Sequence, residues 1–138
     1  MKRVYLDANV IFTAAHNPSG KASLLFELAW EGHWTLITSQ IACEEARRNL
    51  CIKYPECLAR LEDLLRNMRI ISPIPRTACP LDLPLKDQPI FLGALQSGAT
   101  YLLTGDVKHF GRFMERAPET EGVLIQTVSS FFLSILEE

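Results

Sequence analysis

Val4-Tyr5-Leu6-Asp7-Ala8-Asn9-Val10-Ile11 is the stretch that decides the expected fold, because it predicts a short buried strand that ends in a carboxylate. A second stretch of the same form, Tyr101-Leu102-Leu103-Thr104-Gly105-Asp106, lies in the last third of the chain. Two apolar strands that each release an Asp at the carboxyl end predict one acidic pocket assembled from distant parts of the chain.

The composition is that of one globular domain of ordinary size. The chain has 138 residues, 48% of them hydrophobic and 22% charged, which provides enough apolar material for a sizeable core and argues against disorder. We expect residues 1–138 to form a single domain. The net charge of −2 argues against a strongly basic surface, so any contact with nucleic acid must come from local basic clusters.

No C-x-x-C pair occurs among the four cysteines, which are Cys43, Cys51, Cys57 and Cys79. A structural zinc site is therefore not expected. The chain enters its first strand directly after two basic residues, so we expect no signal peptide. No apolar run approaches the roughly 18–20 residues of a membrane span. Together these features predict a cytoplasmic protein with reduced thiols and no membrane association.

Strand and helix patterns alternate along the chain. Helices are expected over Ala8–Ala15, Lys21–Glu31, Gln40 to about Ile52, Pro55 through Leu65, Asp87 to about Ser97, briefly after Asp106, and over Val128–Leu136. Strands are expected, after the first, over Trp34–Thr38, Met68–Ser72, Thr100–Thr104 and Gly122–Gln126. The proline-rich stretch Pro73–Pro84 is expected to be an extended connection within one domain, since neither half has enough elements to close a core of its own.

This alternation predicts an α/β fold, with a central parallel β-sheet of about five strands flanked by helices on both faces. Ligands of such sheets bind beyond the carboxyl ends of the strands, at the point where the strand order switches direction. Asp7 and Asp106 both follow such strand ends, so they are candidates for the ligand site.

Four acidic residues are candidates for a site: Asp7, Glu45, Asp87 and Asp106. Each has an ordinary structural explanation, because Asp is a preferred helix N-cap and the three aspartates all precede expected helices. A single Glu on a helix is more often solvated than buried. The four acids therefore indicate a function only as a group.

As a group, these acids are expected to converge. Two carboxylates at strand ends come together if their strands are neighbours, and Asp87 stands at a helix N-terminus that faces the same edge of the sheet. Glu45 lies on one helix stripe with Ile41, Ala42, Asn49 and Ile52. That stripe is expected to face the interior, whereas the adjacent Glu44 falls on the expected solvent face.

Carboxylates crowded into one cleft repel one another unless a cation lies among them. Hard oxygen ligands of this kind suit Mg²⁺ or Mn²⁺. A divalent ion held by carboxylates favours phosphodiester hydrolysis, because it activates water and stabilises the charge that develops on the phosphate. Either one ion or two would serve.

Three segments follow a known pattern: Leu6-Asp7-Ala8-Asn9-Val10, Thr38 to Ala46, and Asp87-Gln88-Pro89 through Thr104-Gly105-Asp106. They resemble, in turn, the D-x-N opening, the strand-then-helix motif with a Glu, and the closing T-x-D motif of the PIN-domain ribonucleases. This family includes the toxins of VapBC-type toxin–antitoxin pairs, and the resemblance spans nearly the whole chain.

The resemblance implies a metal-dependent endoribonuclease. Its catalytic residues and its ligands for Mg²⁺ or Mn²⁺ would be the four acids Asp7, Glu45, Asp87 and Asp106. Asn9 and Thr104 would be supporting residues that position carboxylates or water. Glu44 stays open as an alternative to Glu45, because the two acids are adjacent.

The same resemblance implies partners. The substrate would be RNA, a toxin would have an antitoxin protein as its partner, and a homodimer is expected. Candidate dimer contacts are Phe131-Phe132-Leu133 and the leucine stripe from Leu58 to Leu65, although core packing explains both equally well.

Basic side chains near the predicted site are candidates for holding RNA phosphates. Among them are Arg48, Lys53, Lys86 and Lys108, which singly are solvated charges and together would form a rim with salt-sensitive affinity. His109 lies close to Asp106 in sequence, so it is a further candidate substrate contact.

Other readings are weaker but distinct. A phosphatase of the haloacid dehalogenase type needs a second Asp two residues after the first, where this chain has Asn9. A receiver-type phosphoacceptor needs an acidic pair near its first strand and a lysine after its last, and neither occurs. The stronger alternative is a non-catalytic binding or dimerisation module, associated with RNA processing, whose acids only cap helices. Divalent-ion binding separates this alternative from a nuclease.

Overall fold

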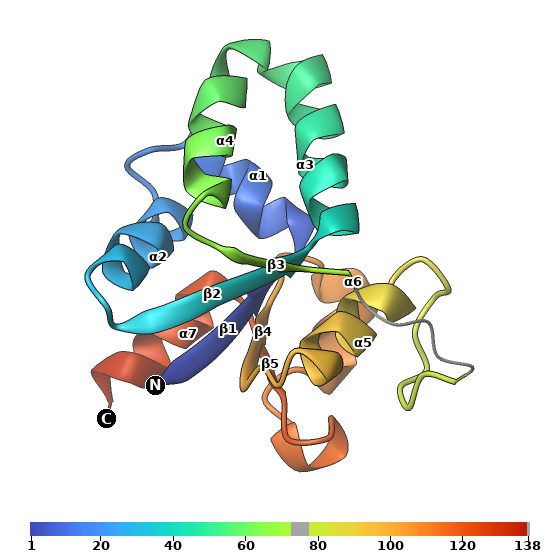
Figure 1. Cartoon of the computed structure of the whole chain (residues 1–138). Helices are drawn as coiled ribbons and strands as arrows, with labels where there is room; N and C mark the ends of the chain where they lie inside the picture. The colour runs from blue at the N-terminus through green and yellow to red at the C-terminus, as the bar shows by residue number, and fades with distance from the viewer. Residues whose placement is uncertain (73–77, 138) are drawn as a thin grey trace.

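Five parallel strands form the centre of the molecule (Figure 1). The structure, a computed structural model, describes residues 1–72 and 78–137. The strands are β1 (Lys2–Leu6), β2 (Trp34–Ser39), β3 (Arg69–Ile71), β4 (Tyr101–Leu103) and β5 (Leu124–Gln126), in the spatial order β3-β2-β1-β4-β5. Every neighbouring pair is parallel. The predicted α/β fold with a five-stranded parallel sheet is confirmed.

The helices follow the predicted order. They are α1 (Ala8–His16), α2 (Lys21–Trp30), α3 (Gln40–Lys53), α4 (Leu58–Leu65), α5 (Gln88–Gln96), α6 (Val107–Phe110) and α7 (Val128–Leu136). Short 3₁₀ turns occur at Pro55–Cys57, Gly111–Phe113 and Ala117–Glu119. Of the predicted connection Pro73–Pro84, residues 73–77 lie outside the described residues, and 78–84 form neither helix nor strand. Among the helices described, none has both the length and the apolar character that a bilayer span requires.

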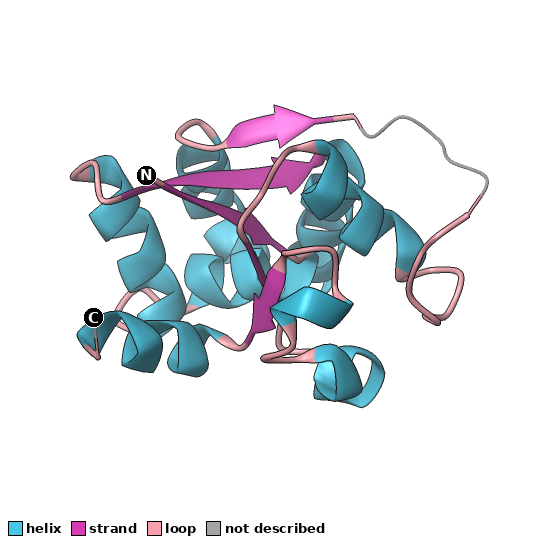
Figure 2. Cartoon of the chain, turned by 90° about the horizontal axis from the view of Figure 1, so that it is seen from below, coloured by secondary structure: helices cyan, strands magenta, loops and turns pink. Residues whose placement is uncertain are grey.

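Alternation along the strands divides the core into two layers (Figures 1 and 2). Leu6 of β1 packs on one face with α1 to α4 and with Phe131 of α7. Tyr5 of the same strand packs on the other face with α5 and with Phe110 of α6. The central strands are therefore covered on both sides, which explains the apolar run Val4–Leu6 of β1 and the apolar sequence of β4.

The face that α3 buries differs from the prediction. The helix buries Ala42, Cys43, Ala46 and Leu50. Ile41 and Ile52, which were expected to face the interior, are 61% and 75% exposed. The helix packs against α1 and α4, and small side chains at its centre permit a close approach. A count of large apolar residues therefore selected the wrong stripe, because the buried stripe is made largely of alanine and cysteine.

The candidate dimer contacts are mostly occupied within the chain. Leu61 and Leu65 of α4 are buried in the core, as is Phe131 of α7. Leu133 is 61% exposed and is available for a further contact. Core packing thus accounts for most of both candidate surfaces.

The strand order determines where a site can form. Strands β1, β2 and β3 follow one another in one direction, and the chain then returns to place β4 on the free edge of β1. The order therefore switches between β1 and β4, and a crevice is expected beyond the carboxyl ends of these two strands. Leu6 pairs with Leu103 in the parallel register, so Asp7 and Thr104 emerge side by side at this point.

Candidate active site

Asp7 lies at the switch point, directly after β1. Its backbone N–H donates to the carbonyl of Leu103 over 3.1 Å, which extends the pairing of β1 with β4 by one residue. Its Oδ1 accepts a hydrogen bond from the backbone N–H of Ala8 over 2.7 Å, so the carboxylate caps α1 as predicted. Its Oδ2 accepts from the hydroxyl of Thr104 over 2.8 Å and from the amide of Asn9 over 3.3 Å.

The charge of Asp7 is poorly compensated. Only 4% of the residue is exposed, and this burial raises the pKa of its carboxyl to about 6. The hydrogen bonds from Thr104 and Ala8 oppose that rise in the pKa, while the charges of Glu45 and Asp87 add to it. A cation placed among these carboxylates would favour the ionised form.

Thr104 joins the two strand ends through its hydroxyl. Besides donating to Asp7, the oxygen accepts from the backbone N–H of Asp106 over 3.0 Å and from the amide of Asn9 over 3.3 Å. Asn9 in turn accepts from the backbone N–H of Gly105 over 2.8 Å. The two residues expected to support the site thus both contact the Asp7 carboxylate directly.

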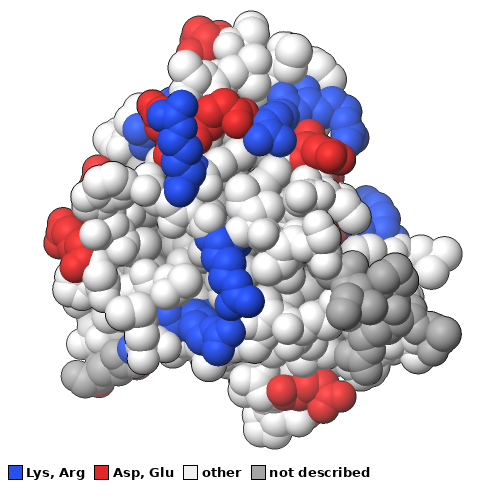
Figure 3. Space-filling model, in the orientation of Figure 1, with Lys and Arg blue, Asp and Glu red and all other residues white. Residues whose placement is uncertain are grey.

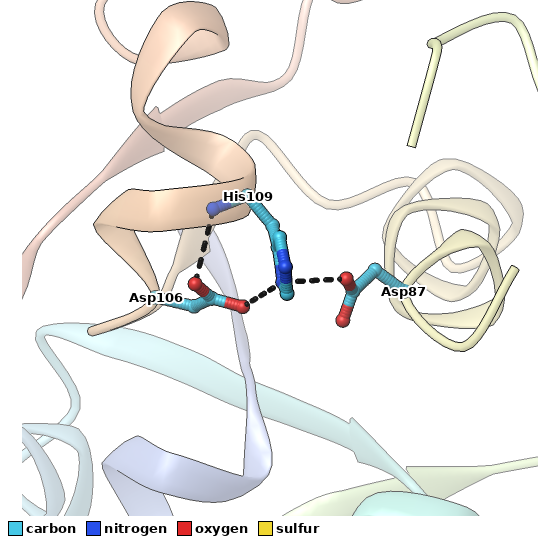
Figure 4. A group of neighbouring side chains, drawn as sticks. All are labelled: Asp87, Asp106 and His109. Carbon is cyan, nitrogen blue, oxygen red and sulfur yellow. Dashed lines mark hydrogen bonds and ion pairs between the residues drawn. The ribbon is translucent and has the colours of Figure 1, made fainter. Parts of the chain in front are cut away.

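Asp106 and Asp87 approach each other through His109 (Figure 4). Asp106 caps the short helix α6 by accepting from the backbone N–H of His109 over 3.1 Å. The Nδ1 atom of His109 lies 2.8 Å from Asp106 Oδ2 and 2.9 Å from Asp87 Oδ2. The hydrogen bond of this nitrogen is to Asp106, so Asp87 Oδ2 meets His109 only as a charge contact and has no hydrogen-bond partner among the described residues.

Asp87 differs from the other two aspartates in its local role. It precedes α5, but its side chain makes no capping hydrogen bond. The residue is nevertheless only 5% exposed. Helix capping therefore explains Asp7 and Asp106 in part and does not explain the burial of Asp87.

One cavity brings the four predicted acids together. It has a volume of about 310 Å³ and is lined by Asp7, Ala8, Asn9, Phe12, Glu45, Asn49, Lys53, Lys86, Asp87, Ile90 and Asp106. Glu45 projects from α3, although its residue is exposed rather than buried as expected. Glu44 lines a different depression, with Cys43 and Arg47. Of the two adjacent acids, Glu45 is thus the one that faces Asp7.

The basic residues of the cavity differ in part from those expected. Lys86 lines it, whereas Arg48 and Lys108 are exposed and lie outside its lining. Lys53, at the end of α3, lines it as well, and its Nζ atom lies 5.7 Å from the ring centroid of Phe12. On the face shown in Figure 3, basic and acidic side chains lie beside one another over α3 and α4, and no broad surface of one sign forms.

Asn49 and Lys53 are two further polar residues of the lining. Asn49 was not assigned to the site from the sequence, whereas Lys53 was among the basic residues expected around it. They follow Glu45 at spacings of four residues, which places all three on one face of α3. This spacing is the signal that would have placed Asn49 in the site. The predicted stripe of Glu45 contains Asn49, but that stripe was interpreted by its isoleucines rather than by its polar members.

The cavity fits a divalent cation. Several carboxylates line it, and burial disfavours the ionised form of Asp7. Among the described residues, no donor forms a hydrogen bond with the buried Oδ2 of Asp87. Oxygen ligands of this type suit Mg²⁺ and Mn²⁺.

Comparison with known proteins agrees with this architecture. The profile of the PIN domain family matches residues 3–108, which are 106 of the 138 residues. The chain belongs to the PIN domain family. The matched range contains all four acids of the cavity, and His109 lies one residue beyond it.

Solved structures share the fold of this PIN domain. One is VapBC2 from Rickettsia felis bound to a DNA fragment from the promoter, with 17% identity, a TM-score of 0.63, and coverage of 91% of this chain and 98% of the other. Another is VapBC-1 from nontypeable Haemophilus influenzae, with 17% identity, a TM-score of 0.58, and coverage of 92% and 98%. At this identity the likeness concerns the fold alone. No curated protein sequence matches the chain.

Proposed function

We propose that this PIN domain is a divalent-metal-dependent endoribonuclease and that residues 1–138 act as one nuclease domain. The observation that carries the proposal is the convergence of Asp7, Glu45, Asp87 and Asp106 on one cavity at the switch point of the sheet. The three aspartates and Glu45 would hold Mg²⁺ or Mn²⁺. Such an ion, when bound, supplies an activated water and stabilises negative charge on the scissile phosphate.

The remaining lining residues have complementary roles in this proposal. Thr104 and Asn9 hold the Asp7 carboxylate in one orientation, so little reorganisation is needed on ion binding. Lys53 and Lys86 provide positive charge beside the acids, where phosphates of an RNA strand would lie. Phe12 and Ile90 form apolar parts of the wall, which limits the access of bulk water.

We further propose that the protein is the toxin of a toxin–antitoxin pair, acting in the cytoplasm. The similar structures from Rickettsia felis and Haemophilus influenzae are both VapBC proteins, which supports an antitoxin partner for this chain. All four cysteines are free, as expected for a reducing compartment. A homodimer remains part of the proposal, and light scattering of the purified protein measures it directly.

Cleavage of a labelled single-stranded RNA tests the nuclease. Mg²⁺ or Mn²⁺ should support cleavage and EDTA should abolish it. Asp7→Asn and Asp106→Asn should each lower the rate by at least about a hundredfold, because a lost ligand removes much of the charge stabilisation. The adjacent acids on α3 provide a matched pair: Glu45→Gln should lower the rate, whereas Glu44→Gln should leave it within about twofold. Full activity of Asp7→Asn in EDTA would refute the proposal.

A non-catalytic module is the second candidate, and one observation favours it. Asp7 and Asp106 do cap helices α1 and α6, so their presence alone requires no chemistry. Asp87 makes no such cap and is buried, which the capping explanation leaves without a cause. A purified protein that binds no Mn²⁺ at millimolar concentration would favour this second candidate.

A further inference from the structure

His109 occupies a position that its role as a candidate substrate contact does not explain. The residue comes from α6, while the carboxylates that it touches come from the end of β4 and from the start of α5. Its ring lies between Asp106 and Asp87, and its side chain is 23% exposed (Figure 4). A residue that recognised RNA would instead be expected to present its ring nitrogen to the open cavity.

Three ligand atoms gather at this point. One atom each from Asp87, Asp106 and His109 lie within 4.8 Å of one another. The Nδ1 atom is 2.8 Å and 2.9 Å from the two carboxylate oxygens. Neighbouring ligands of an octahedral ion, each about 2.1 Å from the metal, are about 3.0 Å apart. The two spacings from Nδ1 are close to those of adjacent ligands on one small cation.

A second observation indicates a ligand at the same place. Only 5% of Asp87 is exposed, and its Oδ2 is directed at this group, where it lies 2.9 Å from His109 Nδ1 but has no hydrogen-bond partner among the described residues. Buried carboxylate oxygens are rarely left without a donor unless they bind an ion. Asp87, Asp106 and His109 thus combine an unsatisfied oxygen with a nitrogen that can coordinate.

We propose that His109 is a metal ligand of this PIN domain, and that Asp87, Asp106 and His109 form a mixed oxygen and nitrogen site that prefers a transition-metal ion such as Mn²⁺ to Mg²⁺. Imidazole nitrogen is a good ligand for first-row transition ions, whereas Mg²⁺ is bound through oxygen. The inference rests on the proposed function and assigns the ion preference of the same site. Ligation through Nδ1 places the ring proton on Nε2.

The alternative role for His109 is electrostatic. As an imidazolium it would neutralise two carboxylates and compete with a metal ion for them. Removing the imidazole distinguishes the two roles. His109→Ala should weaken Mn²⁺ binding if the ring is a ligand, and should strengthen Mn²⁺ binding if the ring is a competing cation.

Mn²⁺ binding to the full chain tests the proposal. Electron paramagnetic resonance counts free Mn²⁺ during titration, and competition with Mg²⁺ gives the ratio of the two affinities. Electron spin-echo envelope modulation detects a ¹⁴N nucleus coordinated to bound Mn²⁺. Three variants are compared with the wild type: His109→Ala, His109→Asp and, as a matched control, His33→Ala. His33 lies 3.8 Å from Glu31 on the surface and is thus a histidine beside a carboxylate far from the cavity.

The wild type should bind Mn²⁺ at least about tenfold more tightly than Mg²⁺ and should show ¹⁴N modulation. His109→Ala should lose the modulation, and its Mn²⁺ affinity should fall at least about tenfold. Even the loss of a residue that only hydrogen-bonds to a metal ligand lowers metal affinity by about this factor. His109→Asp should also lose the modulation, and its preference for Mn²⁺ over Mg²⁺ should fall toward unity. His33→Ala should match the wild type, and circular dichroism checks that each variant is folded.

The outcomes separate this inference from the proposed function. If wild-type protein binds Mn²⁺ and cleaves RNA without ¹⁴N modulation, or if His109→Ala binds Mn²⁺ more tightly, His109 is not a ligand and the nuclease stands. If wild-type protein neither binds Mn²⁺ nor cleaves RNA, both proposals fall together.

Discussion

Asp7 places a negative charge where water hardly reaches it. Burial raises the pKa of its carboxyl from 3.8 to about 6, against the opposing hydrogen bonds from Thr104 and Ala8. The folded protein therefore binds this proton more tightly than the unfolded chain does. Without a cation in the cavity, ionising Asp7 reduces the free energy of unfolding.

We predict that the metal-free protein loses stability as the pH rises from about 4 to about 6. At lower pH the carboxyl is protonated in both states and contributes nothing. Within the window the unfolded chain ionises first, and above it the loss is complete, at up to about 3 kcal/mol from the pKa difference. Urea unfolding in EDTA at a series of pH values measures this loss.

Asp7→Asn removes the titrating carboxyl, so it identifies how much of the pH dependence of the unfolding free energy comes from Asp7. The difference in unfolding free energy between wild type and variant should change by up to about 3 kcal/mol between pH 4 and pH 7, in favour of the variant at pH 7. Asp63→Asn is the control, since Asp63 is an exposed acid 3.0 Å from Arg66. A difference that is the same at both pH values would contradict the assignment to Asp7.

Thr104 is predicted to matter through its hydroxyl rather than through its volume. Thr104→Val keeps the shape but removes the donor to Asp7 and the acceptor for the Asp106 backbone. We expect a loss of about 1–3 kcal/mol in unfolding free energy and a slower cleavage of RNA, because the Asp7 carboxylate loses a donor and the Asp106 backbone N–H loses its acceptor. Thr104→Ser retains the hydroxyl and should recover most of the activity. Equal activity of the Val and Ser variants would exclude this role.

At the level of the elements, α3 shows what the sequence could and could not predict. Its bounds and its Ser39 cap follow from local chemistry and were predicted correctly. Its buried face was not, because the choice between isoleucines and small residues depends on how closely α1 and α4 approach. That distance is a property of three packed helices, and no single helix encodes it.

The polar face of α3 leads to a prediction about RNA. Glu45, Asn49 and Lys53 line the cavity in successive turns, so Lys53 is placed to contact a phosphate next to the acids. Lys53→Ala should weaken RNA binding and reduce the slope of log affinity against log salt by about 1, as expected for one lost phosphate contact. Arg48→Ala is the matched control, because Arg48 lies on the same helix outside the cavity. Equal effects of the two variants would contradict a specific contact.

His109 illustrates a different limit of prediction. The sequence shows that it stands three residues after Asp106, and helical spacing brings these two together. Its contact with Asp87 depends on α5 and α6 packing on the same face of the sheet, which is a tertiary fact. Local spacing therefore explains one of its two contacts, and the fold supplies the other.

For the whole molecule, the sheet order is what converts scattered acids into a site. Two strand patterns that each end in an Asp predicted convergence on the condition that β1 and β4 are neighbours, and they are. The condition itself could not be deduced from the chain, because parallel strands separated by about a hundred residues have many possible orders. The acids were thus predictable as a set, while the shape of the cavity, and which of the candidate basic residues line it, required the fold.

The same convergence predicts that a divalent ion stabilises the entire fold. An ion that binds the folded protein and not the unfolded chain adds about 2.7 kcal/mol at a hundred times its Kd, which corresponds to a rise in Tm of roughly 10 °C for a chain of this size. The rise should grow between pH 5 and pH 7.5, because the ion must displace the proton that Asp7 holds with a pKa of about 6. Calorimetry with Mn²⁺ or EDTA measures it. Asp106→Asn should abolish the rise in Tm and Glu44→Gln should retain it, since Asp106 lines the cavity and Glu44 does not. An equal rise in both variants would mean that the ion binds elsewhere, and the acids at the switch point would then have no metal to hold.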